Sequence, residues 1–139
     1  MVSDSMATPI SYVDAPNVSP AQLAELYNAS GINRPTADLP RLAKMLEHAN
    51  LVIAAYAGDR LVGIARALSD FSYCCYLSDL AVARDFQRQG IGRELIRRVK
   101  LRAGEQSMLL LLSAPTAMAY YPKIGMEKVE NGWIIKRPN

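Results

Sequence analysis

The stretch from Leu77 to Ala103 constrains the fold most, because it reads as a strand, a polar loop with two glycines, and a helix. Residues 77–82 alternate in polarity and carry branched side chains, as half-buried strands do. From residue 91 onward, apolar side chains recur at helical spacing, and Gly104 follows the last of them as a helix-ending residue. The stretch therefore predicts one strand–loop–helix unit of an α/β domain.

Gly90 and Gly92 stand at the expected start of this helix. A glycine in the first turn costs up to about 1 kcal/mol relative to alanine. In return, the first N–H groups of the helix, which lack intrahelical partners and carry positive potential, become accessible to a phosphate. Arg84 and Arg88 add charge beside the loop. The alternative is a connection that uses glycine only to turn.

Two common phosphate motifs are excluded. A P-loop needs Lys-Ser or Lys-Thr after its last glycine, and neither follows Gly92. A dinucleotide fingerprint needs a third glycine at the position of Leu95.

The segment Gln87-x-x-Gly90-x-Gly92 resembles the acyl-CoA-binding motif of the GNAT family of N-acetyltransferases, Gln/Arg-x-x-Gly-x-Gly/Ala. A second segment, Tyr120 to Met126, is similar to the aromatic-Tyr-x-x-x-Gly-Phe signature of that family, with methionine where phenylalanine is usual. The motifs and the order of elements cover roughly Leu51 to the C-terminus. The resemblance implies acetyl-CoA (coenzyme A) as cosubstrate, no metal, and an amine as acceptor.

The resemblance also implies where the cosubstrate binds. Backbone N–H groups of the glycine loop would bind its pyrophosphate, and the backbone of the preceding strand would pair with its pantetheine arm. The loop residues are Gln87, Arg88, Gln89, Gly90, Ile91 and Gly92, and the strand residues are Leu80, Ala81 and Val82. An N–H near the end of that strand is then expected to stabilise the oxyanion. Leu80 and Val82 can serve the core at the same time.

Tyr121 matches the tyrosine of the second motif, counted back from Gly125. It is the candidate general acid for the departing thiolate and a cofactor contact. A phenol with a pKa near 10 carries its proton at neutral pH. The alternative is an aromatic side chain that only packs, which is the role expected for Tyr120.

Asp79 is the candidate general base. It is expected on the same strand face as Tyr73, Cys75 and Leu77, where a carboxylate is costly unless it is paired or functional. Tyr73 could help to position water or substrate. The alternative is a carboxylate that accepts backbone hydrogen bonds or pairs with an arginine.

Arg66 shares parity with apolar residues on its strand and should therefore have a partner. Asp79, Asp70 or a substrate carboxylate could supply one, and we expect an ion pair before a substrate contact. The segment Gly31 to Asp38 is expected to shape the acceptor pocket, because the family varies there.

The remaining pattern predicts a mixed, mostly antiparallel sheet with helices on both faces, which matches the GNAT-like fold. A flexible tail, residues 1–8, precedes a single domain, residues 9–139. The expected helices are Pro20 to Ser30, capped by Ser19, a second one from Asp38 to about His48, and a short one from Ala114 to Gly125. The expected strands are Ile10–Val13, Leu51–Ala57, Leu61–Leu68, Tyr73–Val82, Met108–Leu112 as a buried central strand, and a final hairpin of Glu127–Glu130 and Trp133–Arg137.

Composition supports one domain. The chain has 139 residues, half of them hydrophobic, and a net charge of +3 that is concentrated between Arg84 and Arg102. No aromatic residues of the kind that stack on bases are interleaved along the basic helix, so nucleic acid is not expected as a partner. Cys74 and Cys75 read as reduced thiols. With no signal-peptide pattern and no apolar run of about 18 residues, we expect no membrane partner and a cytoplasmic location.

These features predict an N-acetyltransferase that moves an acetyl group from acetyl-CoA to a primary amine by direct attack in a ternary complex. The acceptor could be a small molecule or a protein amine. A mechanism with Cys75 as a covalent acyl carrier is a weaker hypothesis than direct attack, because no histidine that could activate the thiol lies near it in sequence. The alternatives are a non-catalytic acyl-CoA sensor or interaction module and a nucleic-acid binder that uses the basic helix. A free edge of the C-terminal hairpin could pair with a second copy to form a homodimer.

Overall fold

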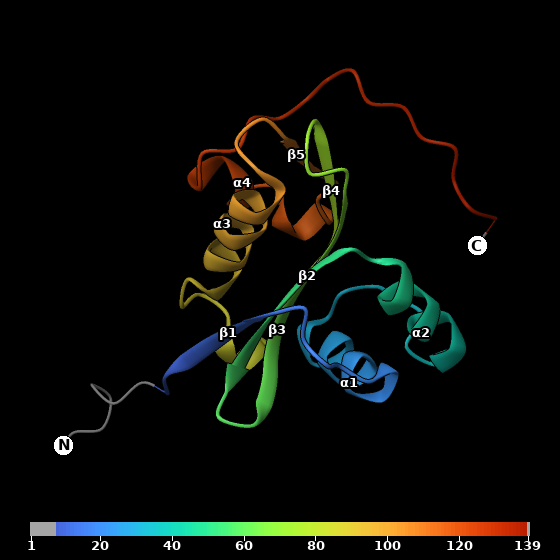
Figure 1. The fold of residues 1–139 in the computed structure, drawn as a ribbon, viewed down its shortest axis with the longest axis vertical. Helices are drawn as coiled ribbons and strands as arrows, with labels where there is room; N and C mark the ends of the chain where they lie inside the picture. The colour runs from blue at the N-terminus through green and yellow to red at the C-terminus, as the bar shows by residue number, and fades with distance from the viewer. Residues whose placement is uncertain (1–7, 139) are drawn as a thin grey trace.

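The computed structural model describes residues 8–138, so most of the tail predicted for residues 1–8 lies outside the described residues. The strands are β1 (Ile10–Asp14), β2 (Leu51–Ala57), β3 (Arg60–Ser69), β4 (Cys74–Val82) and β5 (Met108–Leu111). The helices are α1 (Pro20–Ser30), α2 (Leu39–His48), α3 (Ile91–Ala103) and α4 (Tyr120–Lys123), with short 3-10 turns η2 (Arg84–Phe86) and η3 (Pro115–Ala117). Figure 1 shows their arrangement.

The five strands form one sheet in the order β1-β2-β3-β4-β5. Neighbouring strands are antiparallel except for β4 and β5, which are parallel because α3 connects them. Helix α3 covers one face of the sheet, and α1 and α2 cover the other (Figure 1). The predicted mixed, mostly antiparallel sheet with helices on both faces is therefore confirmed.

The helix ends follow the local sequence signals. The Ser19 hydroxyl accepts from the Gln22 N–H, and the Gln22 side chain accepts from the Ser19 N–H, which completes a capping box. Helix α1 ends at Gly31, which has a left-handed φ of +84°. The Asp38 carboxylate caps α2 by accepting from the Arg41 N–H.

Each helical layer has its own core. The buried side of α3 consists of Ile91, Leu95, Val99 and Ala103. This helix approaches β3 closely at Gly63, where an added Cβ would lie 3.2 Å from Ile91 Cγ2 and 3.3 Å from Leu95 Cδ1. On the opposite face, α1 and α2 pack against Ile64 and Ala81. Gly63 thus fixes the start of α3 over the middle of the sheet.

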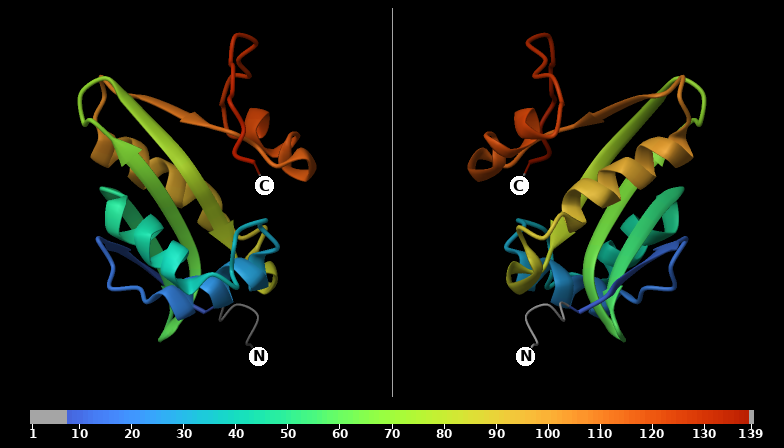
Figure 2. Two further views of the ribbon diagram at one scale, coloured as in Figure 1. Left: turned by 90° about the vertical axis from the view of Figure 1, so that its right-hand side faces the viewer. Right: turned by 90° about the vertical axis from the view of Figure 1, so that its left-hand side faces the viewer.

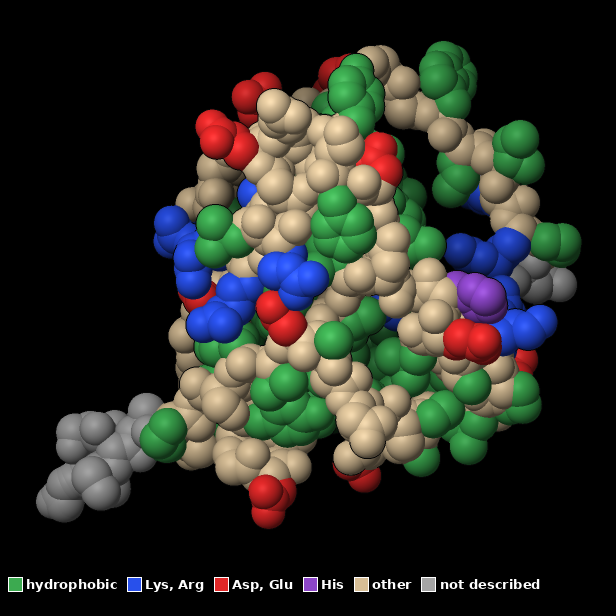
Figure 3. Space-filling view, in the orientation of Figure 1, with side chains coloured by type: hydrophobic (Ala, Val, Ile, Leu, Met, Phe, Trp, Pro, Cys, Tyr) green, Lys and Arg blue, Asp and Glu red, His purple; other side chains and the backbone are tan. Residues whose placement is uncertain are grey.

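The C-terminal part differs from the prediction. No strand follows α4 among the described residues, so the hairpin predicted for residues 127–137 is not formed. The segment runs away from the sheet, and Figure 3 shows an opening between it and the body of the molecule. Trp133 and Ile135 are 98% and 99% exposed. An isolated hairpin is marginal in water, and this segment does not pair with β5, the last strand of the sheet.

Strand β5 is consequently an edge strand and not the buried central strand that its apolar run predicted. Met108 at its start and Leu112 just beyond its end are exposed. The short helix predicted for residues 114–125 is present as two pieces, η3 and α4. Within the described residues, no helix is long and apolar enough to cross a bilayer.

Candidate functional site

Strands β4 and β5 pair at one end and separate at the other. Their pairing runs from Cys74 opposite Met108 to Leu77 opposite Leu111 and goes no further. Figure 2 shows the two strands diverging from there. The register between β3 and β4 shifts at the same place: Asp79 pairs with Arg66 and Leu77 with Ala67, which leaves Ser78 as an extra residue. Such a bulge bends the strand, and this one lies where β4 and β5 separate. We call the opening between the two separated strands the fork.

The second half of β4 presents its backbone to this fork. The Ala83 N–H donates to the Val62 carbonyl on β3, at 2.8 Å. Because backbone groups alternate in direction along a strand, those of Leu80 and Val82 point away from β3. The Gln87 side-chain amide donates to the Val82 carbonyl at 2.8 Å. The edge from Ser78 to Val82 is therefore a template for an extended ligand, with its far end closed by Gln87.

The predicted glycine loop lies at the end of this edge and opens α3. Arg88 and Gly90 both have positive φ, +66° and +85°, which turns the backbone sharply before the helix. No side chain caps the N-terminus of α3. The Glu94 N–H bonds to the Gly90 carbonyl, so the N–H groups of residues 91–93 lack intrahelical partners. The loop thus has the open amides and the positive dipole end that a phosphate requires.

Tyr120 is a residue whose position the sequence did not predict. A Cβ added at Gly92 would lie 3.4 Å from the Tyr120 hydroxyl and 3.9 Å from Leu80 and Val82 side-chain atoms. The first turn of α3, the edge of β4 and Tyr120 therefore meet at one point. Burial raises the pKa of this phenol, and the nearby Arg93 charge opposes the shift. From the sequence, Tyr120 was expected only to pack, because the tyrosine of the motif, counted back from Gly125, is Tyr121.

Tyr121 is half-buried, and its ring lies edge-on to that of Tyr120, with centroids 5.2 Å apart. Its carbonyl accepts from the Ile124 and Met126 N–H groups, which fixes the turn after α4. Burial, with a smaller contribution from Tyr120, raises the pKa of the Tyr121 phenol. The group therefore remains protonated at neutral pH, as a general acid must.

Asp79 is fully buried and accepts four hydrogen bonds. Tyr27 Oη and Arg66 Nε donate to Oδ2, and Arg34 Nε (2.7 Å) and Ser78 Oγ (3.1 Å) donate to Oδ1. Burial raises the pKa of Asp79, but the hydrogen bonds from Arg66 and Tyr27 and the arginine charges outweigh it and lower the pKa. An ionised carboxylate has about four acceptor positions, so all are in use. This geometry favours the structural ion pair over a general base.

The bulge also changes which face Asp79 occupies. Cys75 and Leu77 belong to the core under α3, whereas Asp79 points to Tyr27 on α1. The expectation that these three residues share a face was wrong, because Ser78 inserts one residue and reverses the alternation.

Arg66 pairs with Asp79 at 2.6 Å, so the predicted ion pair is confirmed. Its remaining donors reach the Met45 carbonyl and the Ser78 hydroxyl. Tyr73 is exposed just before β4, at the opposite end of that strand from the glycine loop. The structure therefore separates Tyr73 from the fork.

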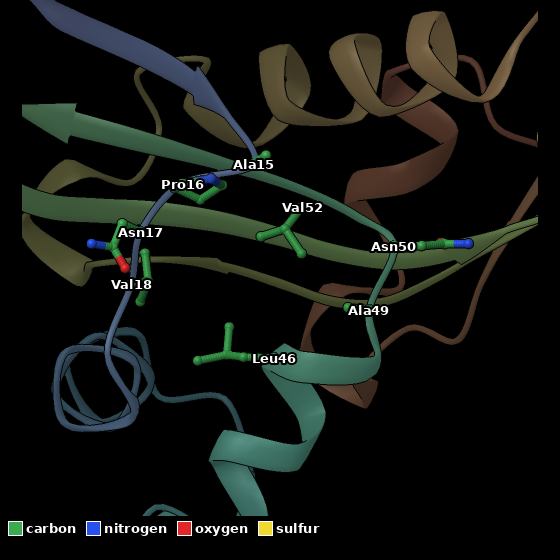
Figure 4. A pocket seen from close by; sticks show the side chains of 8 residues that line it. All are labelled: Ala15, Pro16, Asn17, Val18, Leu46, Ala49, Asn50 and Val52. Atoms are coloured by element: carbon green, nitrogen blue, oxygen red, sulfur yellow. The ribbon is translucent and has the colours of Figure 1, made fainter.

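A shallow pocket lies elsewhere, between the β1–α1 connection and the end of α2 (Figure 4). Ala15, Val18, Leu46 and Val52 are among its lining residues, and none of the predicted site residues is. Asn50 at its edge exchanges two hydrogen bonds with the Ser69 backbone, which ties β2 to β3. We assign this pocket no part in the chemistry.

A comparison with known protein families agrees with this geometry, which combines an open strand edge, an uncapped helix start and two nearby tyrosines. The family model described as an acetyltransferase (GNAT) domain matches residues 23–133. The chain belongs to the GNAT acetyltransferase family. An uncharacterized N-acetyltransferase, ycf52, of Porphyra purpurea is 29% identical in an alignment of 123 positions that covers 84% of this chain and 69% of the relative.

Solved structures agree with this GNAT assignment. A protein of Deinococcus radiodurans R1 assigned as an acetyltransferase is similar at a TM-score of 0.76 and 27% identity, over 95% of this chain and 90% of that chain. The aminoglycoside N-acetyltransferase AAC(6')-Iy, solved in complex with CoA, has a TM-score of 0.68 at 15% identity, over 94% of this chain and 96% of that chain. The second likeness shows the fold alone.

Proposed function

We propose that this GNAT protein transfers an acetyl group from acetyl-CoA to the nitrogen of a primary amine, by direct attack of the amine in a ternary complex. The observation that carries the proposal is the fork, whose open β4 edge leads directly to the uncapped start of α3. Family membership and the CoA complex of AAC(6')-Iy support acetyl-CoA as the cosubstrate. Cys75 is buried and burial raises the pKa of its thiol, which does not suit an acyl carrier.

The chain's own groups would hold the cosubstrate in two places. We assign the pyrophosphate to the N–H groups of the Gln87–Gly92 loop, with Arg88 and Gln89 exposed beside it. We assign the pantetheine arm to the β4 edge, from Leu80 to Val82. Gly92 supports this assignment, because a side chain there would project toward Tyr120 and the edge of β4. The thioester then lies near the bulge, where a β4 N–H could stabilise the oxyanion.

Two tyrosines would have separate roles. We propose Tyr121 as the general acid that protonates the departing thiolate, because its raised pKa keeps the proton available. Tyr120, with its hydroxyl next to Gly92, would contact the cosubstrate instead. Asp79 is not proposed as the base, because its acceptor positions are filled.

Thermal unfolding with and without acetyl-CoA tests binding first. At a ligand concentration of 100 times Kd, stabilisation is about 2.7 kcal/mol, which raises the melting temperature by several degrees. Gly92→Val should abolish the shift while the protein stays folded, and Gly132→Val, in the exposed C-terminal segment where an added Cβ meets no other atom, is the matched control. No stabilisation of the native chain would refute the proposal.

A panel of amines with detection of thiol release tests catalysis. The panel should contain polyamines, amino acid derivatives, aminoglycosides and lysine peptides, because the acceptor could be a small molecule or a protein. Stabilisation by acetyl-CoA without turnover on any amine would instead favour the acyl-CoA sensor. Salt-sensitive DNA binding that acetyl-CoA does not affect would favour the nucleic-acid binder.

We further propose a homodimer and a reducing, cytoplasmic compartment. A second copy could pair with the free edge of β5 and cover the exposed apolar side chains of residues 133–135, Trp133, Ile134 and Ile135. Light scattering after size exclusion should give twice the mass of the chain, and Trp133→Ser should lower the measured mass to that of a single chain.

Cys74 and Cys75 are both free thiols, which supports the proposed reducing, cytoplasmic compartment.

A further inference from the structure

The loop between α1 and α2, residues 31–38, is attached to the mouth of the fork by one side chain. Arg34 donates from Nε to Asp79 Oδ1 at 2.7 Å and from Nη2 to the Ser78 carbonyl at 2.8 Å. Its Nη1 donates to the Asn33 carbonyl within the loop, at 2.7 Å. Ser78 is the bulge residue at which β5 leaves β4. One guanidinium therefore joins the loop to the place where the sheet splits.

This ion pair differs from those on the surface. The Arg34 side chain is 28% exposed, and its partner Asp79 is completely buried and is held by Arg66 and Tyr27 from the other side. By contrast, both side chains of the Arg60–Asp85 pair are at least half exposed. Charge-assisted hydrogen bonds to a fixed, buried acceptor are short and directional, and solvent screens them little. Arg34 can therefore hold its loop in one position.

The start of the loop also touches the glycine-loop side. A Cβ added at Gly31 would lie 2.3 Å from Arg84 Nη2, so the Arg84 guanidinium covers the Gly31 backbone. Gln87 Nε2 lies 3.5 Å from the Ser30 carbonyl. The loop thus contacts the connection to α3 at its beginning and the fork at Arg34.

We propose that Arg34 is a positioning residue, which fixes residues 31–38 as a preformed wall at the mouth of the fork, where the acceptor amine enters. The inference rests on the proposed function for the identity of the acceptor, but not for the attachment of the loop. A wall that is already ordered costs the acceptor no loop-ordering entropy on binding. Loss of Arg34 therefore weakens acceptor binding more than it slows the chemical step.

Hydrogen exchange and steady-state kinetics of Arg34→Ala, Arg34→Lys and the native chain test this role. Arg41→Ala, an exposed arginine on α2, is the matched control. In Arg34→Ala, we expect amides of residues 31–38 to exchange roughly tenfold faster or more, because the two charge-assisted hydrogen bonds that join the loop to the fork are lost. Exchange in α3 increases much less, and the Kd for acetyl-CoA stays unchanged. The KM for the acceptor rises about tenfold with a smaller change in kcat.

The lysine variant keeps the charge but cannot bridge Asp79 and the Ser78 carbonyl, so it should recover only part of the protection. Native exchange of residues 31–38 in Arg34→Ala would overturn the proposal, and so would an increase in these residues no larger than the increase in α3, which indicates a general stability role. If the native chain neither binds acetyl-CoA nor acetylates an amine, the proposed function fails, whereas the exchange comparison still decides whether Arg34 holds the loop.

Discussion

Replacing Asp79 by asparagine distinguishes a structural carboxylate from a catalytic one. The carboxylate accepts four hydrogen bonds, from Tyr27, Arg34, Arg66 and Ser78. An amide keeps one acceptor oxygen and turns its NH₂ toward two of these donors. Two hydrogen bonds to a charged group are worth about 3–6 kcal/mol. Water can reach the partly exposed Arg34 side chain and recover some of this, so we expect a loss of about 3–5 kcal/mol, as for other broken buried pairs.

Urea unfolding measures this loss. With a slope of about 2 kcal/mol per molar urea, a loss of about 4 kcal/mol lowers the midpoint by about 2 M. Asp85→Asn removes an exposed partner of Arg60 and should leave the midpoint almost unchanged. Asp79→Leu combined with Arg66→Met and Tyr27→Phe should recover much of the lost stability, because the buried donors are removed together with the carboxylate and the partly exposed Arg34 can turn to water. A native midpoint for Asp79→Asn together with lost turnover would refute the structural role and restore the general base.

Three further outcomes are expected. Tyr121→Phe should lower kcat at least tenfold with little change in the Kd for acetyl-CoA, and equal turnover of the native and Tyr121→Phe proteins would remove the acid role. Tyr120→Phe should instead weaken acetyl-CoA binding and leave kcat largely unchanged. Gly92→Ala should weaken acetyl-CoA binding about tenfold in calorimetry without loss of stability, since alanine favours the helix; native affinity would contradict the phosphate assignment. Asp70 has a pKa of about 2, lowered by backbone N–H groups of the following turn, and the pKa of Asp79 is also lowered, by its arginines and Tyr27. Both groups therefore stabilise the fold above their unfolded pKa near 3.9, and the urea midpoint should fall as pH drops from about 4 toward 2, with a shallower fall in Asp70→Asn.

The features that could be predicted from sequence are those set by neighbours in the chain. The Ser19 capping box, the Asp38 cap and the glycine loop before α3 each depend on a few consecutive residues, and each is present in the structure. Arg66 could be assigned a partner because a buried arginine needs one, whatever the fold.

The features that could not be predicted depend on residues far apart in the chain. The bulge at Ser78 follows from the register of β3 against β4, and it moved Asp79 to the face of α1. Arg34 reaches Asp79 across 45 positions, so no local pattern marks it. An apolar strand such as β5 predicts burial, but its place at the edge depends on what the C-terminal segment does.

The half of β4 left without a neighbouring strand has a consequence for handling the protein. Unpaired N–H and C=O groups in an extended row can pair with any stretched peptide, including a misfolded chain. A ligand bound along the open edge of β4 would occupy these backbone groups and so prevent this kind of aggregation. Concentrated samples should therefore stay clear for longer when acetyl-CoA is kept in the buffer, even where no acceptor is present and no turnover takes place.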